Sequence, residues 1–359
     1  MKFNQALLKK ILLVLILPLL AIEYGQAQST GTQAHDPVMA KEDGTYYLFY
    51  TGEGIQIKSS PDMENWEHRG QVFDSAPEWT LDVVPEFENV MWAPDIAEHN
   101  GTYYLYYSVS QFGRNSSAIG VVTNQTLDPD APDYEWEDQG KVIQSVPGRD
   151  MWNAIDPNMA FDDEGTPWLA FGSFWMGVKI VKMEDNLTEI ARRPQEWHTI
   201  AERHRYWKLD ERDAGDAANP ELNYDSLYTD QILEKARNTE FGAVEAPFIF
   251  KQNGYYYLFI SWDRCCRGTE STYKIMVGRS KEITGPYLDR KGKDLKHGGG
   301  TLVADGNEEW AAVGHPAAYT FDGTDYLVFH GYDSNDDGKA KLWISDIQWQ
   351  DGWPTISLD

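Results

Sequence analysis

The sequence predicts an all-β protein, a five-bladed β-propeller. One hairpin pattern recurs five times along the chain, and three copies are preceded by an acidic residue with a proline one or two positions later. Five units of about four strands each suit radial closure, which leaves only short, protected sheet edges. A β-sandwich is the alternative, but it does not account for five copies of one hairpin.

Each copy of the hairpin has the same parts. A short strand comes first, then a tight turn in which Asn, Asp or Glu precedes Gly, which is a strong hairpin signal. A run rich in Tyr, Phe and Trp follows, and such residues favour strands. A third strand can be placed after most copies, and a fourth after some. The five units are Asp43–Thr51, Asn100–Ser108, Glu164–Gly172, Asn253–Ser261 and Asp322–His330.

One segment interrupts this order. Residues 191–240 are rich in charge and poor in strand signal. We expect them to form a partly helical insertion between the third and fourth blades. Insertions of this length either belong to a functional face or are solvated surface loops, and both readings stay open.

The first 27 residues have the pattern of a secretory signal peptide. Basic residues precede a short apolar run, and small residues follow around Ala27. The apolar run is too short for a membrane span, although an uncleaved anchor is the alternative. We therefore expect residues 1–27 to be removed and residues 28–359 to form one catalytic propeller domain. The mature protein would be periplasmic or extracellular, with no membrane attachment.

The chain is strongly acidic, with 31 Lys and Arg against 57 Asp and Glu. Loss of residues 1–27, which hold three lysines and one glutamate, would change the net charge from −26 to −28. Such a field repels nucleic acid and anionic lipid, whereas a neutral polysaccharide is an acceptable partner. The expected form is a monomer.

The only two cysteines, Cys265 and Cys266, are adjacent. Neighbouring cysteines rarely bond, because the ring that they would close is strained. The protein therefore does not depend on a disulfide framework and must be held together by its core. The pair is either an unusual vicinal disulfide beside the substrate or two buried thiols.

Three carboxylates occupy similar positions before the hairpins: Asp36, Asp156 and Glu245. Because proline restricts the preceding residue to extended geometry, we expect each acid to be fixed at a strand entrance. First strands line the channel of a propeller, so the three side chains should converge. Trp92 takes the equivalent place in the second blade and His315 in the fifth. Converging acids suit glycoside hydrolysis, which needs a protonated acid and a carboxylate base or nucleophile.

At these residues the chain resembles glycoside hydrolase family forty-three, most closely its secreted endo-arabinanases. The resemblance covers residues 34–346. The acidic motifs are shared with xylosidases and arabinofuranosidases, whereas the paired cysteines and the Gly-Ser-Phe-Trp segment are more specific for arabinanases. The segments that carry it are His35–Pro37, Met91–Ile96, Trp152–Pro157, Phe171–Trp175, Glu245–Pro247 and Cys265–Gly268.

The resemblance implies a role for each acid. Asp36 would be the general base that activates water, and Glu245 the general acid. Asp156 would orient Glu245 and raise its pKa by like-charge repulsion. The family inverts configuration, so the carboxyls of base and acid should lie roughly 6.5–9.5 Å apart.

The resemblance also implies a metal and a substrate-binding set. Similar arabinanases hold a calcium ion on the axis, and His315 matches the histidine near it. Calcium prefers oxygen ligands, so water or carboxylate would complete the shell. Apolar sugar faces suit aromatic planes. The substrate-binding residues would be Trp92, Asn153, Ser173, Phe174 and Trp175.

The function that this pattern favours is endo-hydrolysis of α-1,5-L-arabinan, with arabinan or arabino-oligosaccharides as substrate. An exo-acting α-L-arabinofuranosidase or β-xylosidase on the same scaffold is the enzymatic alternative. The non-enzymatic alternative is a carbohydrate-binding propeller, which the presence of all three acids disfavours.

Overall fold

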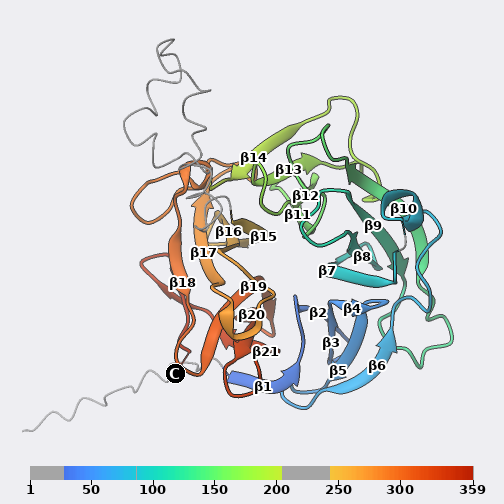
Figure 1. Cartoon of the computed structure of the whole chain (residues 1–359), viewed down its shortest axis with the longest axis horizontal. Helices are drawn as coiled ribbons and strands as arrows, with labels where there is room; N and C mark the ends of the chain where they lie inside the picture. Colours follow the sequence, from blue (N-terminus) through green and yellow to red (C-terminus); the bar gives the residue numbers. More distant parts are fainter. Residues whose placement is uncertain (1–27, 86, 204–242, 359) are drawn as a thin grey trace, which may run out of the picture.

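The structure is a computed structural model that describes residues 28–85, 87–203 and 243–358. It confirms the five-bladed β-propeller: five antiparallel sheets stand around a common centre, and the chain passes through them in order (Figure 1). Among the described residues, no helix has the length and apolar character that a membrane crossing requires.

The first three blades follow one another directly from the N-terminal side. The second contains a fifth strand, the short β4, which leaves the first blade to pair with β7. Blade one consists of β2 (Val38–Glu42), β3 (Thr45–Tyr50), β5 (Gln56–Ser60) and β6 (Glu67–Gln71); blade two of β4 (Gly52–Glu53), β7 (Val90–His99), β8 (Thr102–Val109), β9 (Ser117–Asn124) and β10 (Glu137–Ser145); blade three of β11 (Asn158–Phe161), β12 (Pro167–Phe171), β13 (Val178–Lys182) and β14 (Trp197–Ala201).

The last two blades complete the ring, and a two-stranded hairpin follows them. Helical structure in the described residues is limited to one α-helical turn and two 3₁₀ turns. Blade four consists of β15 (Val244–Gln252), β16 (Tyr255–Trp262), β17 (Lys274–Ser280) and β18 (Thr301–Ala304); blade five of β19 (Trp310–Phe321), β20 (Thr324–Asp333), β21 (Lys339–Asp346) and β1 (Gln28–Gln33); the hairpin of β22 (Gln348–Gln350) and β23 (Trp353–Thr355); the turns are α1 (Thr80–Val83), η2 (Gly268–Glu270) and η3 (Leu295–His297).

Ring closure uses the N-terminal strand. β1 is the outermost strand of blade five and pairs with β21, so the two ends of the chain share one sheet. Ser29 lies opposite Trp343 in this pairing. The sequence analysis assigned no strand to this segment, because its composition is polar and its partner is more than three hundred residues away.

The five hairpins share their turn geometry and their core position. In four of them both turn residues have positive φ, as in Asn100 (54°) and Gly101 (79°), which two-residue turns between twisted strands require. One leucine per unit is fully buried at the equivalent place in the second strand. These leucines are Leu48, Leu105, Leu169, Leu258 and Leu327.

The expected insertion at residues 191–240 needs correction at its start. Trp197–Ala201 form β14, which pairs with β13 as the fourth strand of blade three. The charged residues hid this strand, because an outer strand presents much of its surface to solvent. Residues 204–242 of the expected insertion, and the signal peptide expected at residues 1–27, lie outside the described residues.

Candidate active site

The five blade entrances have one unusual backbone conformation in common. In each blade the residue just before the proline of the first strand has positive φ. The sequence analysis expected extended geometry at the three acids, and that expectation is wrong for Asp36 and Asp156. A β-bulge lies at several of these entrances, and it turns the backbone before the strand pairs. The residues are Asp36 (φ 50°), Ala93 (38°), Asp156 (56°), Ala246 (53°) and His315 (57°).

Hydrogen bonds from the preceding blade hold these entrances. The last residue of four of the five hairpin units supplies the acceptor, so Ser108 Oγ accepts from Asp156 N–H at 3.1 Å and Ser261 Oγ from His315 N–H at 2.8 Å. Thr51 and His330 do the same for Ala93 and Asp36. Each blade thus positions the next.

The fourth blade departs from this scheme, because its predecessor ends in Gly172, which has no side chain. Asp156 Oδ2 instead accepts from Ala246 N–H at 3.1 Å. Since Ala246 holds the repeat position, Glu245 stands one residue before it, and Trp92 likewise precedes Ala93. The expectation that Glu245 and Trp92 are equivalent to Asp36 is therefore wrong by one residue. The proline, and not the acid, occupies the same position in all five blades.

The three acids nevertheless meet in one cavity of about 760 Å³. Each is 7% exposed or less, so all three carboxyls are buried. The cavity wall includes all nine residues that the sequence analysis selected: Asp36, Trp92, Asn153, Asp156, Ser173, Phe174, Trp175, Glu245 and His315.

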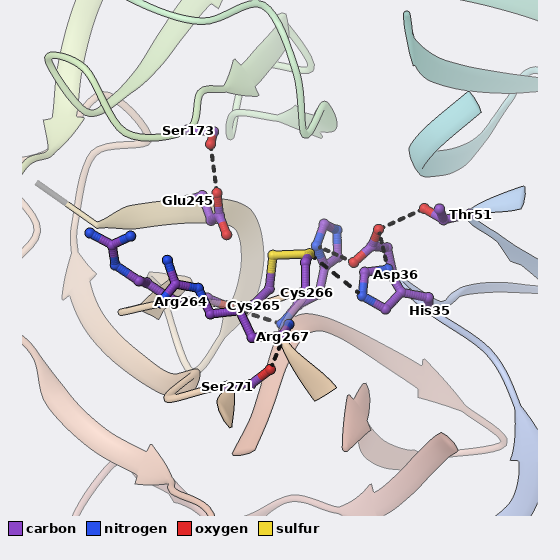
Figure 2. Close-up of a disulfide and its surroundings, with 12 residues drawn as sticks. His35, Asp36, Thr51, Ser173, Glu245, Arg264, Cys265, Cys266, Arg267 and Ser271 are labelled. Carbon is purple, nitrogen blue, oxygen red and sulfur yellow. Dashed lines mark hydrogen bonds and ion pairs between the residues drawn. A yellow bond between two sulfur atoms is a disulfide. The ribbon is translucent and has the colours of Figure 1, made fainter. Parts of the chain in front are cut away.

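Asp36 is surrounded by hydrogen-bond donors. His315 Nδ1 lies 3.0 Å from Oδ1. His35 Nδ1 and Thr51 Oγ1 lie 2.9 and 2.6 Å from Oδ2 (Figure 2). Burial acts to raise the pKa of Asp36, but the two histidines outweigh it and hold this pKa well below its usual range. A lowered pKa favours the ionised carboxylate, which is the form that a general base requires.

Glu245 has the opposite character. Burial is the largest cause and raises its pKa, although Ser173 Oγ donates to Oε2 at 2.5 Å. The charge on Asp36 adds to the rise. A carboxyl that keeps its proton is suited to protonate a leaving group. The sequence analysis named repulsion by Asp156 as the cause, whereas burial comes first.

Asp156 links the other groups. Burial is the largest cause and raises the pKa of Asp156 to about 8. The charges of Glu245 and Asp36 also raise this pKa, whereas the nearby His315 lowers it. Its bond to Ala246 N–H fixes the backbone next to Glu245. Asp156 can therefore orient the segment that carries Glu245.

The predicted substrate-binding residues lie around these acids. Trp92 and Phe174 are partly exposed on the cavity wall, as is Trp175. Phe174 and Trp175 both have positive φ, at 53° and 40°, and such strain in bulky residues is typical of functional sites. Asn153 is buried, and within the described part of the chain its Oδ1 has no hydrogen-bond partner, so it is free to bind a sugar hydroxyl.

The sequence analysis did not select His330 and Tyr332, which contact Asp36 and His35. His330 is fully buried beneath His35, with ring centroids 4.2 Å apart. Tyr332 Oη lies 2.9 Å from His35 Nε2. Their signal was present, because His330 ends the fifth hairpin unit as Ser108 ends the second.

Cys265 and Cys266 form a vicinal disulfide, and Cys266 is exposed, so the reading as two buried thiols is wrong.

Two groups of residues can be tested for a metal. His35, Asp36 and His330 are close enough to share an ion. They fit poorly, because His330 Nδ1 already accepts from Asp36 N–H and both nitrogens of His35 are bonded. His315 fits better, since of its ring nitrogens only Nδ1 has a hydrogen-bond partner among the described residues, Asp36, and buried carboxyls line the same cavity. Burial acts to lower the pKa of His315, but the surrounding acids raise it to about 9, so an ion at Nε2 would have to replace a proton.

The comparisons with known proteins agree with this geometry. Residues 30–354 match the model of the glycosyl hydrolases family 43. The chain belongs to this family. A similar solved structure is that of Cellvibrio cellulosa α-L-arabinanase complexed with arabinohexaose, with 47% identity, a TM-score of 0.80, and coverage of 91% of this chain and 96% of that one.

Two curated relatives of this family member differ in their mode of action. An extracellular exo-α-(1→5)-L-arabinofuranosidase of Cellvibrio japonicus is 49% identical over 90% of this chain and 86% of its own length. An extracellular endo-α-(1→5)-L-arabinanase of Bacillus subtilis is 40% identical over 89% of this chain and 87% of its own.

Proposed function

We propose that this protein is an exported hydrolase of α-1,5-L-arabinofuranosidic bonds in arabinan and arabino-oligosaccharides. The observation that carries the proposal is the pair of buried carboxyls with opposite pKa shifts in one cavity: Asp36 ionised, Glu245 protonated. The names of the two relatives support arabinan as the substrate and an extracellular location.

In the proposed mechanism, Asp36 takes a proton from the attacking water while Glu245 protonates the leaving oxygen. Asp156 holds Glu245 in place through Ala246. The attack would invert the anomeric configuration, for which the two carboxyls need a separation of roughly 6.5–9.5 Å. Proton NMR of the first product formed from arabino-oligosaccharide tests inversion directly.

The sequence favours endo cleavage, and the Bacillus subtilis relative supports it. Exo cleavage is the second candidate, and the more similar Cellvibrio japonicus relative favours it. Digestion of linear arabinan with sizing of products over time distinguishes them. Early mixed oligomers indicate endo action, and accumulation of one short product from the start indicates exo action. No cleavage of arabinan would contradict the proposed function.

We also propose one calcium ion beside the acids, with His315 Nε2 and buried oxygens as its surroundings. The ion would supply positive charge among the carboxyls, and binding to the folded state alone would add stability. A chelator should then lower both the melting temperature and the rate, with calcium restoring both. His315→Ala should abolish the effect of the chelator on the melting temperature. Absence of metal in elemental analysis, with no effect of chelator, would refute this site.

A further inference from the structure

The vicinal disulfide lies in the wall of the catalytic cavity. Cys265 and Cys266 line it together with Arg264, Arg267 and the acids. In Figure 2 the S–S bond appears between Glu245 and the His35–Asp36 pair. Cys266 Sγ is 3.9 Å from His35 Nε2. Because Cys266 is exposed whereas the carboxyls are buried, the disulfide is part of the surface that a bound chain meets first.

The chemistry of this wall suits a sugar. A disulfide is apolar and polarisable and has no proton to donate, so it favours the C–H face of a ring over its hydroxyls. Arg264 and Arg267, the neighbours of the pair in sequence, line the same cavity, and guanidinium groups donate several hydrogen bonds to oxygen. An apolar surface with hydrogen-bond donors in the same wall suits a sugar ring and its hydroxyls.

The loop that carries the disulfide has an unusual backbone conformation. Cys266 has φ 67°, in the left-handed region that is unfavourable for residues with a β carbon. In this conformation Cys266 N–H donates to Tyr332 Oη at 2.8 Å, and Tyr332 Oη in turn contacts His35. Loss of the S–S bond removes a covalent constraint on this residue and leaves the hydrogen bond to Tyr332 to hold it.

We propose that the Cys265–Cys266 disulfide is a substrate-binding platform that contacts an arabinose ring of the bound chain, and that its reduction weakens binding. This inference rests on the proposed function. Reduction needs a dithiol such as dithiothreitol. One of its thiolates attacks a cysteine sulfur to form a mixed disulfide, and the second then closes the oxidised reagent. Two electrons and two protons pass to the protein, leaving two free thiols.

Calorimetric titration of arabinohexaose into the Glu245→Gln variant tests the platform, because binding is then measured without turnover. We expect the Kd to rise about five-fold on reduction, which corresponds to the loss of about 1 kcal/mol of contact. The chain contains only two cysteines, so a count of two free thiols proves that reduction is complete.

The matched control carries Cys265→Ser and Cys266→Ser in the Glu245→Gln background. This variant should bind as weakly as the reduced protein, and dithiothreitol should not change its Kd. Melting curves show that each form is folded. An unchanged Kd with two free thiols, or a folded double-serine variant that binds like the oxidised protein, overturns the platform. Failure of the oxidised protein itself to bind arabinohexaose would instead refute the proposed function.

Discussion

At the scale of single residues, two carboxyls of similar chemistry are given different protonation states by their neighbours. Asp36 and Glu245 are equally buried, and burial raises both pKa values. Asp36 receives donors from two histidines, which reverse the effect, whereas Glu245 receives mainly the Ser173 hydroxyl. The difference supports the proposed roles of Asp36 as the base and Glu245 as the acid.

Replacing either group should abolish most of the activity without unfolding the protein. We expect Asp36→Ala and Glu245→Ala each to lower the rate on arabinan by about 10²–10⁴-fold, the range for general acid–base groups. The loss in Glu245→Ala should shrink on substrates with good leaving groups, because these need less protonation. Near-normal turnover of arabinan by either folded variant would remove the assignment.

The pH dependence should respond to Asp156. Asp156 and Glu245 are buried together, so the charge of one makes removal of the proton from the other more difficult. Because the pKa of Asp156 is raised to about 8, its charge forms only at the alkaline end of the pH–rate profile. Asp156→Asn cannot form this charge, and the alkaline limb should move to lower pH. The shift should be partial, because burial of Glu245 remains. An unmoved limb would show that Asp156 acts only through its contact with Ala246.

At the scale of the element, the strand entrance is a repeated device in which one blade supplies the acceptor for a backbone N–H of the next. The device tolerates different acceptors, since Thr51, Ser108, Ser261 and His330 all serve. It also explains why Asp156 has a structural duty besides its place among the acids: it replaces the side chain that Gly172 lacks.

Removal of one acceptor should destabilise the protein by a definite amount. Ser261 is fully buried, so Ser261→Ala would leave His315 N–H without its partner. We expect the free energy of unfolding to fall by about 1–3 kcal/mol, the cost of an unsatisfied buried donor. Denaturant unfolding measures this loss, with the exposed Ser75→Ala as control. Equal stability of the two variants would contradict the role of Ser261.

At the scale of the whole molecule, the ring is closed by a strand from the opposite end of the chain. β1 completes blade five beside β21, and Asp36, which follows β1 closely, takes its backbone acceptor from His330 of the same blade. Closure of the ring by β1 and the position of Asp36 are therefore coupled. Anything that frees β1 should disturb both stability and activity.

Truncation tests this coupling. Removal of residues 1–33 deletes β1, and the free energy of unfolding should fall by on the order of 3 kcal/mol, at about 1 kcal/mol per lost ladder hydrogen bond. Activity on arabinan should fall with it. Removal of residues 1–27 alone is the control and should leave the melting temperature unchanged. If the variant that begins at residue 34 has the same melting temperature as this control, β1 does not close the ring.

The repeat, the five blades and the three acids were predictable from the sequence, because each depends on local patterns. Turn residues, strand periodicity and a proline at each entrance lie within a few residues of one another. The buried leucine of each unit follows from the same spacing. The choice of Asp36, Asp156 and Glu245 followed from their repetition one or two residues before a proline, although Glu245 lies one residue out of register.

The remaining features could not be predicted from local patterns, because they join residues that are far apart in the chain. Asp36 and His330 are separated by 294 positions, and β1 and β21 by a similar span. The left-handed entrances depend on such contacts, which outweigh the local preference before proline. The disulfide wall and the opposite pKa shifts of Asp36 and Glu245 likewise arise when closure of the ring brings charges and burial together.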